Sequence, residues 1–517
     1  MKKIGLIFFL ILPLSVFCQK TKVEIVSGNF LEGFKTDSGE LKRVIGNCQF
    51  KQDDVTLWCD TAILDSRNNK LKAVGRVRIL QVGGVRITAD RLNYDGNTYL
   101  AELFDNITLR DERGVLTTNR LNYRTDTQAG QYYNGGMLVD KDNVLTSKTG
   151  YYYANENNAF FKDSVVLKNP EYRITCDTLK YNTTAETSWF YGPTNIVGNN
   201  EILYCEKGYY NSATGQSRFG KNANFKSGAQ ELYGDSLVYN KFTGIGMAFG
   251  NITFRDTAEQ ILLKGHYARY NEKNEEVLVI DSALLIALIE GDSLFIHGDT
   301  MFSFKERNDT MEVRRVRAFH HVKMFKDDFQ ASADSLTFNS KDSVLNCFGT
   351  PVLWIEGSQL SGDTIQIKLK NGKMHKLYLN SEAFVIYPEE EDKNRFNQIR
   401  GRNMEGFFKN NQFTKLFVEG NGQSVYYARE DSGAYIGVNQ SECSSMIIKF
   451  KDNRASQITF ITQPDALFYP LEQISPQELM LRGFNWRMAE KPISRDDIFR
   501  EQSVQPPNLG MEAPFAP

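Results

Sequence analysis

The feature that most constrains the fold is a sequence pattern that returns about every 29 residues along most of the chain. Its clearest copy covers residues 87–109, ITADRLNYDGNTYLAELFDNITL. Apolar and polar residues alternate up to Tyr94, a turn sequence occupies residues 94–97, and the alternation resumes from Leu103 to Leu109. Alternation with period two is typical of strands that bury one face. Each copy is therefore predicted to hold two short strands joined by a turn.

Two markers make the repeat traceable along the chain. The first is an anchor of the form D-x-L-x-Y, best preserved at Asp177, Asp235 and Asp334 and weakest at Thr149, His266 and Asn403. The second, such as F-D-N-I at residues 104–107 or F-G-N-I at residues 249–252, follows about 15 residues later. We interpret the second motif as the entry into the second strand. The anchors begin at Asp60, Asp90, Asn119, Thr149, Asp177, Glu206, Asp235, His266, Asp299, Asp334, Asp363 and Asn403. This regular spacing indicates a tandem array.

The alternation predicts an all-β chain. Between residues 23 and 427 strand and turn patterns follow one another, and no 12-residue stretch has helical periodicity. Short turns such as residues 169–171 allow neighbouring strands to pair as hairpins, which excludes a parallel sheet with helical crossovers and disfavours a β-helix. The predicted fold is an elongated antiparallel β-jellyroll or sandwich of about twelve tandem 29-residue two-strand repeats, with each repeat adding one strand to each sheet.

Composition narrows the functional classes. Hydrophobic residues make up 41% of the chain, with 35 Phe and 24 Tyr, which is enough apolar material for a β core and too much for a disordered chain. The formal net charge is −2, with acidic and basic residues interleaved. No overall basic field therefore recruits nucleic acid or an anionic membrane surface.

The chain is expected to have four parts. Residues 1–18 combine two lysines with an apolar run that ends at Cys18, which is typical of a secretory signal peptide. Lipid attachment at Cys18 is the alternative, and the bulky Phe17 argues against it. Residues 19–430 form the repeat array, residues 431–490 a C-terminal capping segment, and residues 491–517 a mobile Pro-rich tail.

One cysteine pair is a candidate for a disulfide. If residues 53–54 form a two-residue turn, then Cys48 and Cys59 are directly opposed on neighbouring strands. A disulfide is one interpretation and a pair of small buried thiols is the other. We favour the buried thiols, because directly opposed strand residues seldom reach disulfide geometry without strain.

Nothing in the sequence indicates an enzyme. His320 and His321 are the only adjacent histidines, and neighbours on a strand face opposite sides, so they cannot chelate one metal ion together. The recurring Asp anchors form a ladder rather than the single carboxylate pair of a glycosidase, and hydrogen bonding at a turn or bulge explains their recurrence. No cofactor or metal is expected.

The whole pattern resembles the OstA-like proteins, the family of the periplasmic lipopolysaccharide-transport protein LptA and of the N-terminal domain of LptD. The residues that carry the resemblance are A-D-x-L-x-Y, as in Ala89–Tyr94, and F-G-N-I-x-F, as in Phe249–Phe254. The resemblance covers residues 23–427, although the array is much longer than a minimal bridge protein of the family. It implies a jellyroll groove that shields the acyl chains of lipopolysaccharide in the periplasm, with subunits that join edge to edge.

The expected function is therefore a periplasmic lipopolysaccharide-binding transport or bridge protein of outer-membrane biogenesis. Its expected partners are lipopolysaccharide and other lipopolysaccharide-transport proteins that pair through edge strands, with or without association to the outer membrane. The alternative is a structural envelope scaffold that binds proteins through its sheet edges. The side chains predicted by parity to line the groove are Leu92, Tyr94, Ile107, Leu109, Leu121, Tyr123, Leu179, Tyr181, Leu237, Tyr239, Leu336 and Phe338.

The two ends of the array are predicted to differ. Unpaired strand edges either pair with another chain or are covered. The first strand, at residues 23–30, follows directly after the signal peptide, so we expect an open N-terminal edge. Residues 446–486 are predicted to fold back over the C-terminal edge as a cap.

Overall fold

The structure is a computed structural model that describes residues 21–36, 39–112, 114–153, 156–258, 260–289, 292–308, 311–339, 341–389, 392, 394–409, 412–430, 433–451 and 454–500. The predicted signal peptide and Cys18 lie outside these residues. The described part is almost entirely β-structure, and all pairings given for its strands are antiparallel. The predicted all-β antiparallel fold is confirmed.

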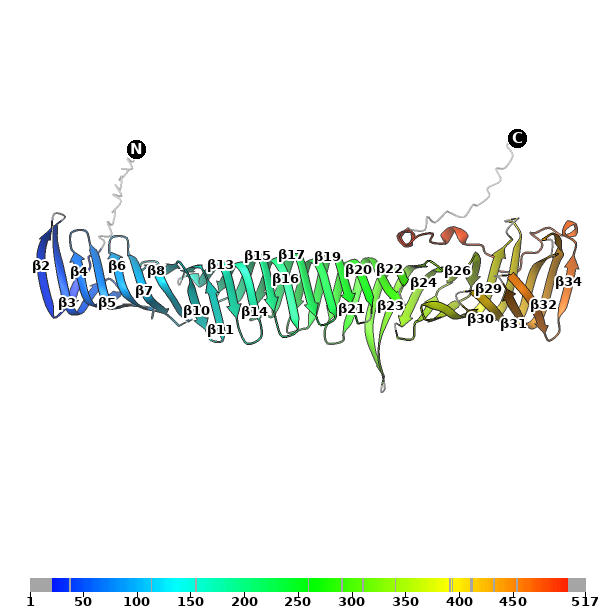
Figure 1. Ribbon diagram of the computed structural model, residues 1–517, viewed down its shortest axis with the longest axis horizontal. Helices are drawn as coiled ribbons and strands as arrows, with labels where there is room; N and C mark the ends of the chain where they lie inside the picture. Colours follow the sequence, from blue (N-terminus) through cyan, green and yellow to red (C-terminus); the bar gives the residue numbers. More distant parts are fainter. Residues whose placement is uncertain are drawn as a thin grey trace, which may run out of the picture. The chain divides into compact units, whose positions relative to one another are not determined.

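The chain divides into two compact units rather than one array. Unit 1 comprises residues 1–199 and 206–213, and unit 2 comprises residues 200–205 and 214–517, so that β16 (Glu201–Asn211) is divided between them. The strands of unit 1 follow one another in chain order (Figure 1). They are β1 (Glu24–Ser27), β2 (Phe30–Thr36), β3 (Gly39–Gln52), β4 (Val55–Asp65), β5 (Lys70–Gln81), β6 (Arg86–Asp95), β7 (Leu100–Arg110), β8 (Val115–Arg124), β9 (Ala129–Tyr132), β10 (Gly136–Asp140), β11 (Asn143–Ser147), β12 (Thr149–Tyr153), β13 (Asn158–Lys168), β14 (Arg173–Asn182) and β15 (Thr187–Val197).

Unit 2 continues the same plan and ends in a segment with little regular structure. Its strands are β17 (Gln216–Ser227), β18 (Gln230–Asn240), β19 (Ile245–Asp256), β20 (Ile261–Asn271), β21 (Glu276–Ile289), β22 (Asp292–Asn308), β23 (Met311–Lys326), β24 (Phe329–Asn339), β25 (Val344–Phe348), β26 (Val352–Ile355), β27 (Ser358–Ser361), β28 (Thr364–Lys370), β29 (Lys373–Pro388), β30 (Phe396–Lys409), β31 (Gln412–Arg429), β32 (Tyr435–Lys451), β33 (Arg454–Ile461) and β34 (Asp465–Tyr469). Three short 3-10 helices follow, η2 (Leu471–Gln473), η3 (Met488–Glu490) and η4 (Asp497–Phe499).

Consecutive strands pair as hairpins, and the turn of the clearest repeat lies two residues beyond the predicted residues 94–97. In the clearest repeat, Ile87 of β6 is opposite Leu109 of β7, and Tyr94 is opposite Ala101. The turn between them occupies residues 96–99. Each 29-residue repeat therefore supplies two strands, as the sequence pattern predicts.

A β-bulge interrupts most of these strands near their middle. In the pairing of β5 with β6, Val74 is opposite Arg91 and Val77 is opposite Ala89, so two residues of β5 face one residue of β6. The bulge residues have positive φ. They begin at Gly46, Gly75, Asp105, Asn134, Asp163, Gly192, Lys221, Gly250, Asp281, His320, Gly349, Ser381 and Gly420. The second sequence motif therefore marks this bulge, and our interpretation of it as the entry into a strand is wrong.

The Asp anchors lie beside these bulges on the neighbouring strand. Arg76 Nε donates to Asp60 Oδ1 over 2.9 Å, and Asn106 Nδ2 donates to Asp90 Oδ2 over 2.7 Å. A Cβ added at Gly75, where φ is +80°, would lie 2.5 Å from Asp60 Oδ2, so only glycine fits there. The separation of about 15 residues between the two motifs therefore reflects a contact between neighbouring strands.

The bulges divide the strands into halves that form two layers. Pairing of β8 passes at the bulge from β9 to β10: Leu121–Arg124 pair with β9 and Val115–Thr118 pair with β10. Leu116 and Leu138 on one side, and Tyr132 and Phe161 on the other, line the same small cavity. Each strand thus contributes to both layers. The expectation that a repeat adds one whole strand to each sheet is wrong in this respect.

The C-terminal residues 471–500, here called the strap, lie against unit 2 in a way that was not predicted. Leu479 and Leu481 are 1% and 7% exposed and pack with Phe384, Ile386 and Val425. η4 contacts β22 and β23, and Ile498 is 1% exposed. The strap therefore crosses the strands from β32 back to β22 (Figure 1). Residues 491–500 belong to it, so the predicted mobile tail does not begin at residue 491.

Both ends of the described sheet carry a split edge strand. In unit 1, β1 and β2 both pair with β3. In unit 2, β33 and β34 both pair with β32. Residues 454–469 therefore extend the sheet, and the strap covers a face of it. The predicted covering of the C-terminal edge by residues 446–486 does not match this arrangement.

Candidate functional site

The predicted groove residues of unit 1 form a closed interior. Their alternation along the strands directs them between the two layers, where bulk water is excluded. Six of them are between 0% and 6% exposed: Leu92, Tyr94, Ile107, Leu109, Leu121 and Tyr123. Leu179 is buried as well, and Tyr181 is half-buried.

The tyrosine hydroxyls of this interior are bound to protein groups. Tyr123 donates to Gln81 Oε1 over 2.9 Å, and Gln81 Nε2 donates to the carbonyl of Thr125 over 2.6 Å. The Tyr94 hydroxyl lies 3.3 Å from Thr125 Oγ1. Burial raises the pKa of Tyr94 to about 12 and also raises that of Tyr123. These tyrosines are neutral hydrogen-bonding groups and not acid–base catalysts at neutral pH.

The predicted groove residues of unit 2 behave in the same way. Leu237, Leu336 and Phe338 are between 2% and 5% exposed. Tyr239 lies nearer the surface, and its hydroxyl donates to Glu272 Oε2 over 2.5 Å. The structure therefore buries ten of the twelve predicted residues inside the units and leaves Tyr181 and Tyr239 half-buried, but it does not gather them around one large open cavity.

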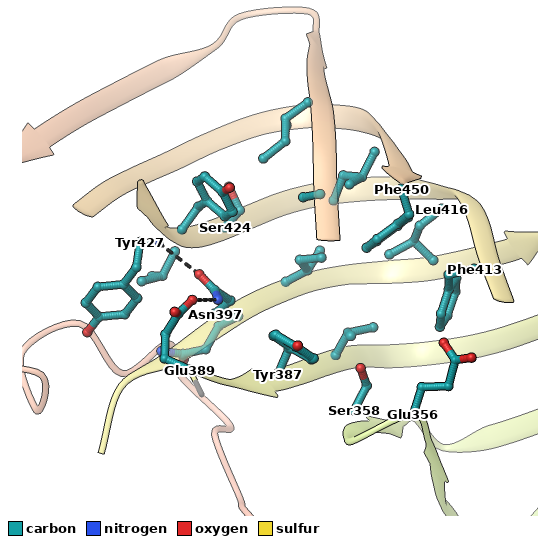
Figure 2. Close-up of a pocket in the computed structure, with 18 of the residues that line it drawn as sticks. Glu356, Ser358, Tyr387, Glu389, Asn397, Phe413, Leu416, Ser424, Tyr427 and Phe450 are labelled. Atoms are coloured by element: carbon teal, nitrogen blue, oxygen red, sulfur yellow. Dashed lines mark hydrogen bonds between the residues drawn. The ribbon is translucent and has the colours of Figure 1, made fainter. Parts of the chain in front are cut away.

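A cavity with a mainly apolar lining lies elsewhere in unit 2 and was not predicted. Its volume is about 110 Å³, and residues of β27, β29, β30, β31, β32 and β33 contribute to its wall. Figure 2 shows Phe413, Leu416 and Phe450 at one end and Tyr387, Asn397 and Glu389 toward the other. The cavity thus has a polar end at Glu389, and its other end is mainly apolar, with Glu356 and Ser358 on the same side as Phe413.

A buried ion pair closes the polar end. Glu389 is 8% exposed and accepts hydrogen bonds from Arg429, Asn397 and the Tyr435 hydroxyl. Asn397 Oδ1 accepts from the backbone N–H of Tyr427 over 2.8 Å (Figure 2). One carboxylate therefore joins β29, β30, β31 and β32. Glu389 and Arg429 are 40 residues apart, and no local sequence pattern could have revealed the pair.

The volume of this cavity limits what it can hold. An apolar cavity of roughly 150 Å³ accommodates one benzene-sized molecule. A cavity of about 110 Å³ therefore holds only a molecule smaller than benzene. The space around Leu109 and Tyr181 is about 40 Å³. A long acyl chain would enter either space only if the layers moved apart.

The described residues contain no group of three or more His, Cys, Asp or Glu side chains arranged to hold a metal ion. His320 and His321 occupy a bulge. His321 Nδ1 lies 2.9 Å from Asp299 Oδ2, and His320 Nδ1 lies 3.6 Å from Asp334 Oδ1. The two imidazoles therefore pair with different strands. That the chain is not an enzyme remains a prediction.

The cysteine pair has the predicted register. Cys48 is directly opposite Cys59 in the pairing of β3 with β4, and both are buried. Each is a free thiol in the structure, and burial raises both pKa values. Both interpretations, buried thiols and a disulfide, therefore stay predictions.

Within the described residues, no helix has the length and apolar character needed to span a membrane. Residues 20–177 match the family model described as "OstA-like protein". No curated protein matches the chain.

Among solved structures, the chain is similar to LptH, the LptA-homologous periplasmic component of the lipopolysaccharide transport device of Pseudomonas aeruginosa. The identity is 13%, the match covers 23% of this chain and 82% of that chain, and the TM-score is 0.20. A likeness this distant does not bear on the activity of the chain. The family match rests on the repeats of unit 1, whose strands and bulges are described above, and residues 20–177 therefore belong to the OstA-like family.

Proposed function

We propose that this protein is a periplasmic bridge protein of outer-membrane biogenesis, which carries lipopolysaccharide with its acyl chains between the two layers. The observation that carries the proposal is the OstA-like match of residues 20–177, over strands whose inward side chains form a continuous apolar interior. An apolar space between sheets suits alkyl chains and requires no catalytic group. The twelve predicted groove residues are the proposed lining.

Acyl chains would have to replace side-chain packing in this interior. Each buried methylene contributes about 0.8 kcal/mol, so about ten methylenes contribute about 8 kcal/mol. Because Leu92, Leu103 and Leu121 are at most 1% exposed, they already fill the space in the closed state. We propose that lipid binding separates the two layers. The free energy gained by burying the acyl chains then offsets the packing energy lost when the side chains of the two layers move apart.

The open N-terminal edge is the proposed contact with other lipopolysaccharide-transport proteins. β1 and β2 present exposed side chains, among them Phe30 at 70% and Leu31 at 63%. An unpaired strand edge with exposed apolar residues favours the addition of a partner strand. Export to the periplasm is proposed from residues 1–18, with or without association to the outer membrane.

The proposal is tested by site-specific photo-crosslinking in cells. A photoreactive residue at Leu92, which faces the interior, should capture lipopolysaccharide, whereas the same residue at the exposed neighbour Asn93 should not. Tyr181 provides a second interior position. Equal capture at Leu92 and Asn93, or none at any interior position, would exclude carriage between the layers.

The closed interior favours a second candidate function. A space filled by side chains suits a structural envelope scaffold that binds proteins through its sheet edges. This scaffold would retain partner proteins in pull-down experiments. Substitution of interior leucines by bulkier residues would change its stability but not the amount of lipid that copurifies with it. Absence of copurifying lipid together with edge-dependent partner binding would favour the scaffold.

A further inference from the structure

The strap is held by side-chain amides that bind its backbone. Gln398 Nε2 donates to the carbonyl of Leu479 over 3.2 Å, and Gln398 Oε1 accepts from the N–H of Leu481 over 2.9 Å. Gln359 does the same with the carbonyl of Asn485 and the N–H of Arg487, both over 2.6 Å. Each glutamine thus binds residues i and i+2 of the strap, as the edge of a strand would.

These two glutamines are built into the sheet and are not surface side chains. Gln359 and Gln398 are each 1% exposed. Each is opposite Ile386 in the strand register, so the two glutamines flank β29 in one row across the sheet. A buried amide without a partner is costly, and the strap backbone supplies the partners. The row is therefore a binding site for an extended backbone, and the strap is its occupant.

The strap and the cavity adjoin the same half-strands. Phe384 and Ile386 pack with Leu479 and Leu481 of the strap. The alternating residues Val385 and Tyr387 line the cavity of about 110 Å³, and successive strand residues point to opposite faces. Gln398, Val425 and Tyr427 border both the strap and the cavity. The strap therefore contacts part of the cavity wall directly.

The strap ties many strands together across their direction. Its contacts reach Val425 in β31 and Val438 in β32 at one end and β22 and β23 at the other. The Phe499 ring lies 4.6 Å from that of His297 in β22, between ring centroids. A segment fixed at both ends opposes any change in the spacing or curvature of the strands below it.

The strap itself has little structure of its own. Between residues 471 and 500 the described chain forms three 3-10 helices of three residues each and isolated turns, and no strand. Its fully buried side chains are few, among them Leu479, Leu481 and Ile498, and others such as Phe484 and Trp486 are only partly buried. Segments with few buried contacts open at lower free energy than the paired strands beneath them. The strap can therefore leave while the sheet remains folded.

We propose that the strap is a releasable lock that keeps the layers of unit 2 closed over the interior cavity, and that its release allows the cavity to widen and admit an alkyl chain. This inference rests on the proposed function, since it describes the control of the same apolar interior. The amides of Gln359 and Gln398 are the latch. Widening of the cavity then requires the strap to detach first.

The test uses the full chain with Gln359→Leu and Gln398→Leu together. Hydrogen exchange at the amides of Leu481 and Arg487 should accelerate by roughly ten-fold or more, because each amide loses its acceptor. Uptake of a fluorescent alkyl naphthylamine should rise by roughly the same factor. Asn69→Leu is the matched control: Asn69 holds the carbonyl of Thr21 and the N–H of Val23 in unit 1 by the same geometry, and its loss should leave uptake by unit 2 unchanged.

A second variant covers the case in which the double variant does not fold. Gln398→Glu keeps the volume, but the ionised carboxylate cannot donate to the Leu479 carbonyl. At neutral pH the Leu481 amide should exchange faster in Gln398→Glu than in the unaltered chain at the same pH, and this ratio should fall toward one below about pH 4, where a Glu is protonated. A freed strap with unchanged probe uptake overturns the lock. Cross-linking of lipopolysaccharide at Leu92 tests the proposed function separately, because Leu92 belongs to unit 1.

Discussion

Replacement of a bulge glycine by alanine should cost more where an Asp anchor lies beside it. Gly250 has φ +68°, and a Cβ added there would lie 2.2 Å from Asp235 Oδ2. Gly228, in the turn between β17 and β18, has φ +55° and no heavy atom within 4 Å of an added Cβ. Both substitutions force alanine into the left-handed region, at a cost of roughly 1–2 kcal/mol. Only Gly250→Ala also creates a clash.

The clash has a defined consequence. Asp235 must turn away, and it then loses the hydrogen bond from Asn251 Nδ2, which is 3.0 Å long. A hydrogen bond of this kind contributes about 1 kcal/mol. We therefore expect Gly250→Ala to destabilise the β18–β19 pairing by about 1 kcal/mol more than Gly228→Ala. The difference should disappear in an Asp235→Ala background, where the Cβ has room.

Native-state hydrogen exchange of the β18 and β19 amides is the suitable measurement, because it reports local opening within a large repeat protein. The Asp235→Ala single variant provides the reference for the double variant. Equal costs at Gly228 and Gly250, or a difference that persists without Asp235, would refute the role assigned to the Asp anchors.

Three further predictions follow from buried polar contacts. Arg429→Met should destabilise unit 2 by about 3 kcal/mol, because it leaves Glu389 buried without its ion-pair partner; the midpoint of denaturation followed by Trp354 fluorescence measures this, and rescue by Glu389→Gln would support the cause. Acidification should weaken the turns around Lys326: its hydrogen bond lowers the pKa of Asp292 below 3.8, so this stabilisation is present above pH about 4 and is lost as the pH falls through the lowered pKa. Hydrogen exchange near residue 292 should then show no such acid dependence in Lys326→Met. Finally, Cys48 and Cys59 should stay two buried thiols when oxidised glutathione is offered as the oxidant; two alkylatable thiols after denaturation are expected, and an intact mass lighter by two hydrogens, abolished by Cys59→Ser, would show the disulfide instead.

The strand register was predictable because turn chemistry is local. A two-residue turn at residues 53–54 predicted that Cys48 is opposite Cys59, and the structure has this pairing. Buried positions such as Leu92 and Leu121 followed from the alternation of side chains along a strand. Both conclusions depend only on residues that lie close together in the sequence.

The bulges and the strap were not recognised, although both left signals. Motifs such as F-G-N-I contain glycine and asparagine, which tolerate positive φ and are typical of bulges. The run Val352–Ile355 does not alternate, and all four side chains are at most 1% exposed. Continuous apolar runs indicate a strand covered on both faces. The strap provides the second cover, but its hydrogen-bonding partner Gln398 lies 81 residues from Leu479 along the chain.

The position of the bulges bears on how a closed interior could open. The contacts that fix each bend, such as Arg76 with Asp60 and Asn106 with Asp90, lie at the exposed corners of the fold and not between the layers. The distance between the layers depends instead on side-chain packing of residues such as Leu103 and Leu121. Layers can therefore separate without breaking the strand ladders or the corner hydrogen bonds. In unit 1 the alternating positions of β5, including Lys70, Lys72 and Arg78, are exposed, so none of the described residues covers this strand as the strap covers strands of unit 2. In unit 2 the strap lies on the corresponding face, and opening there requires its release.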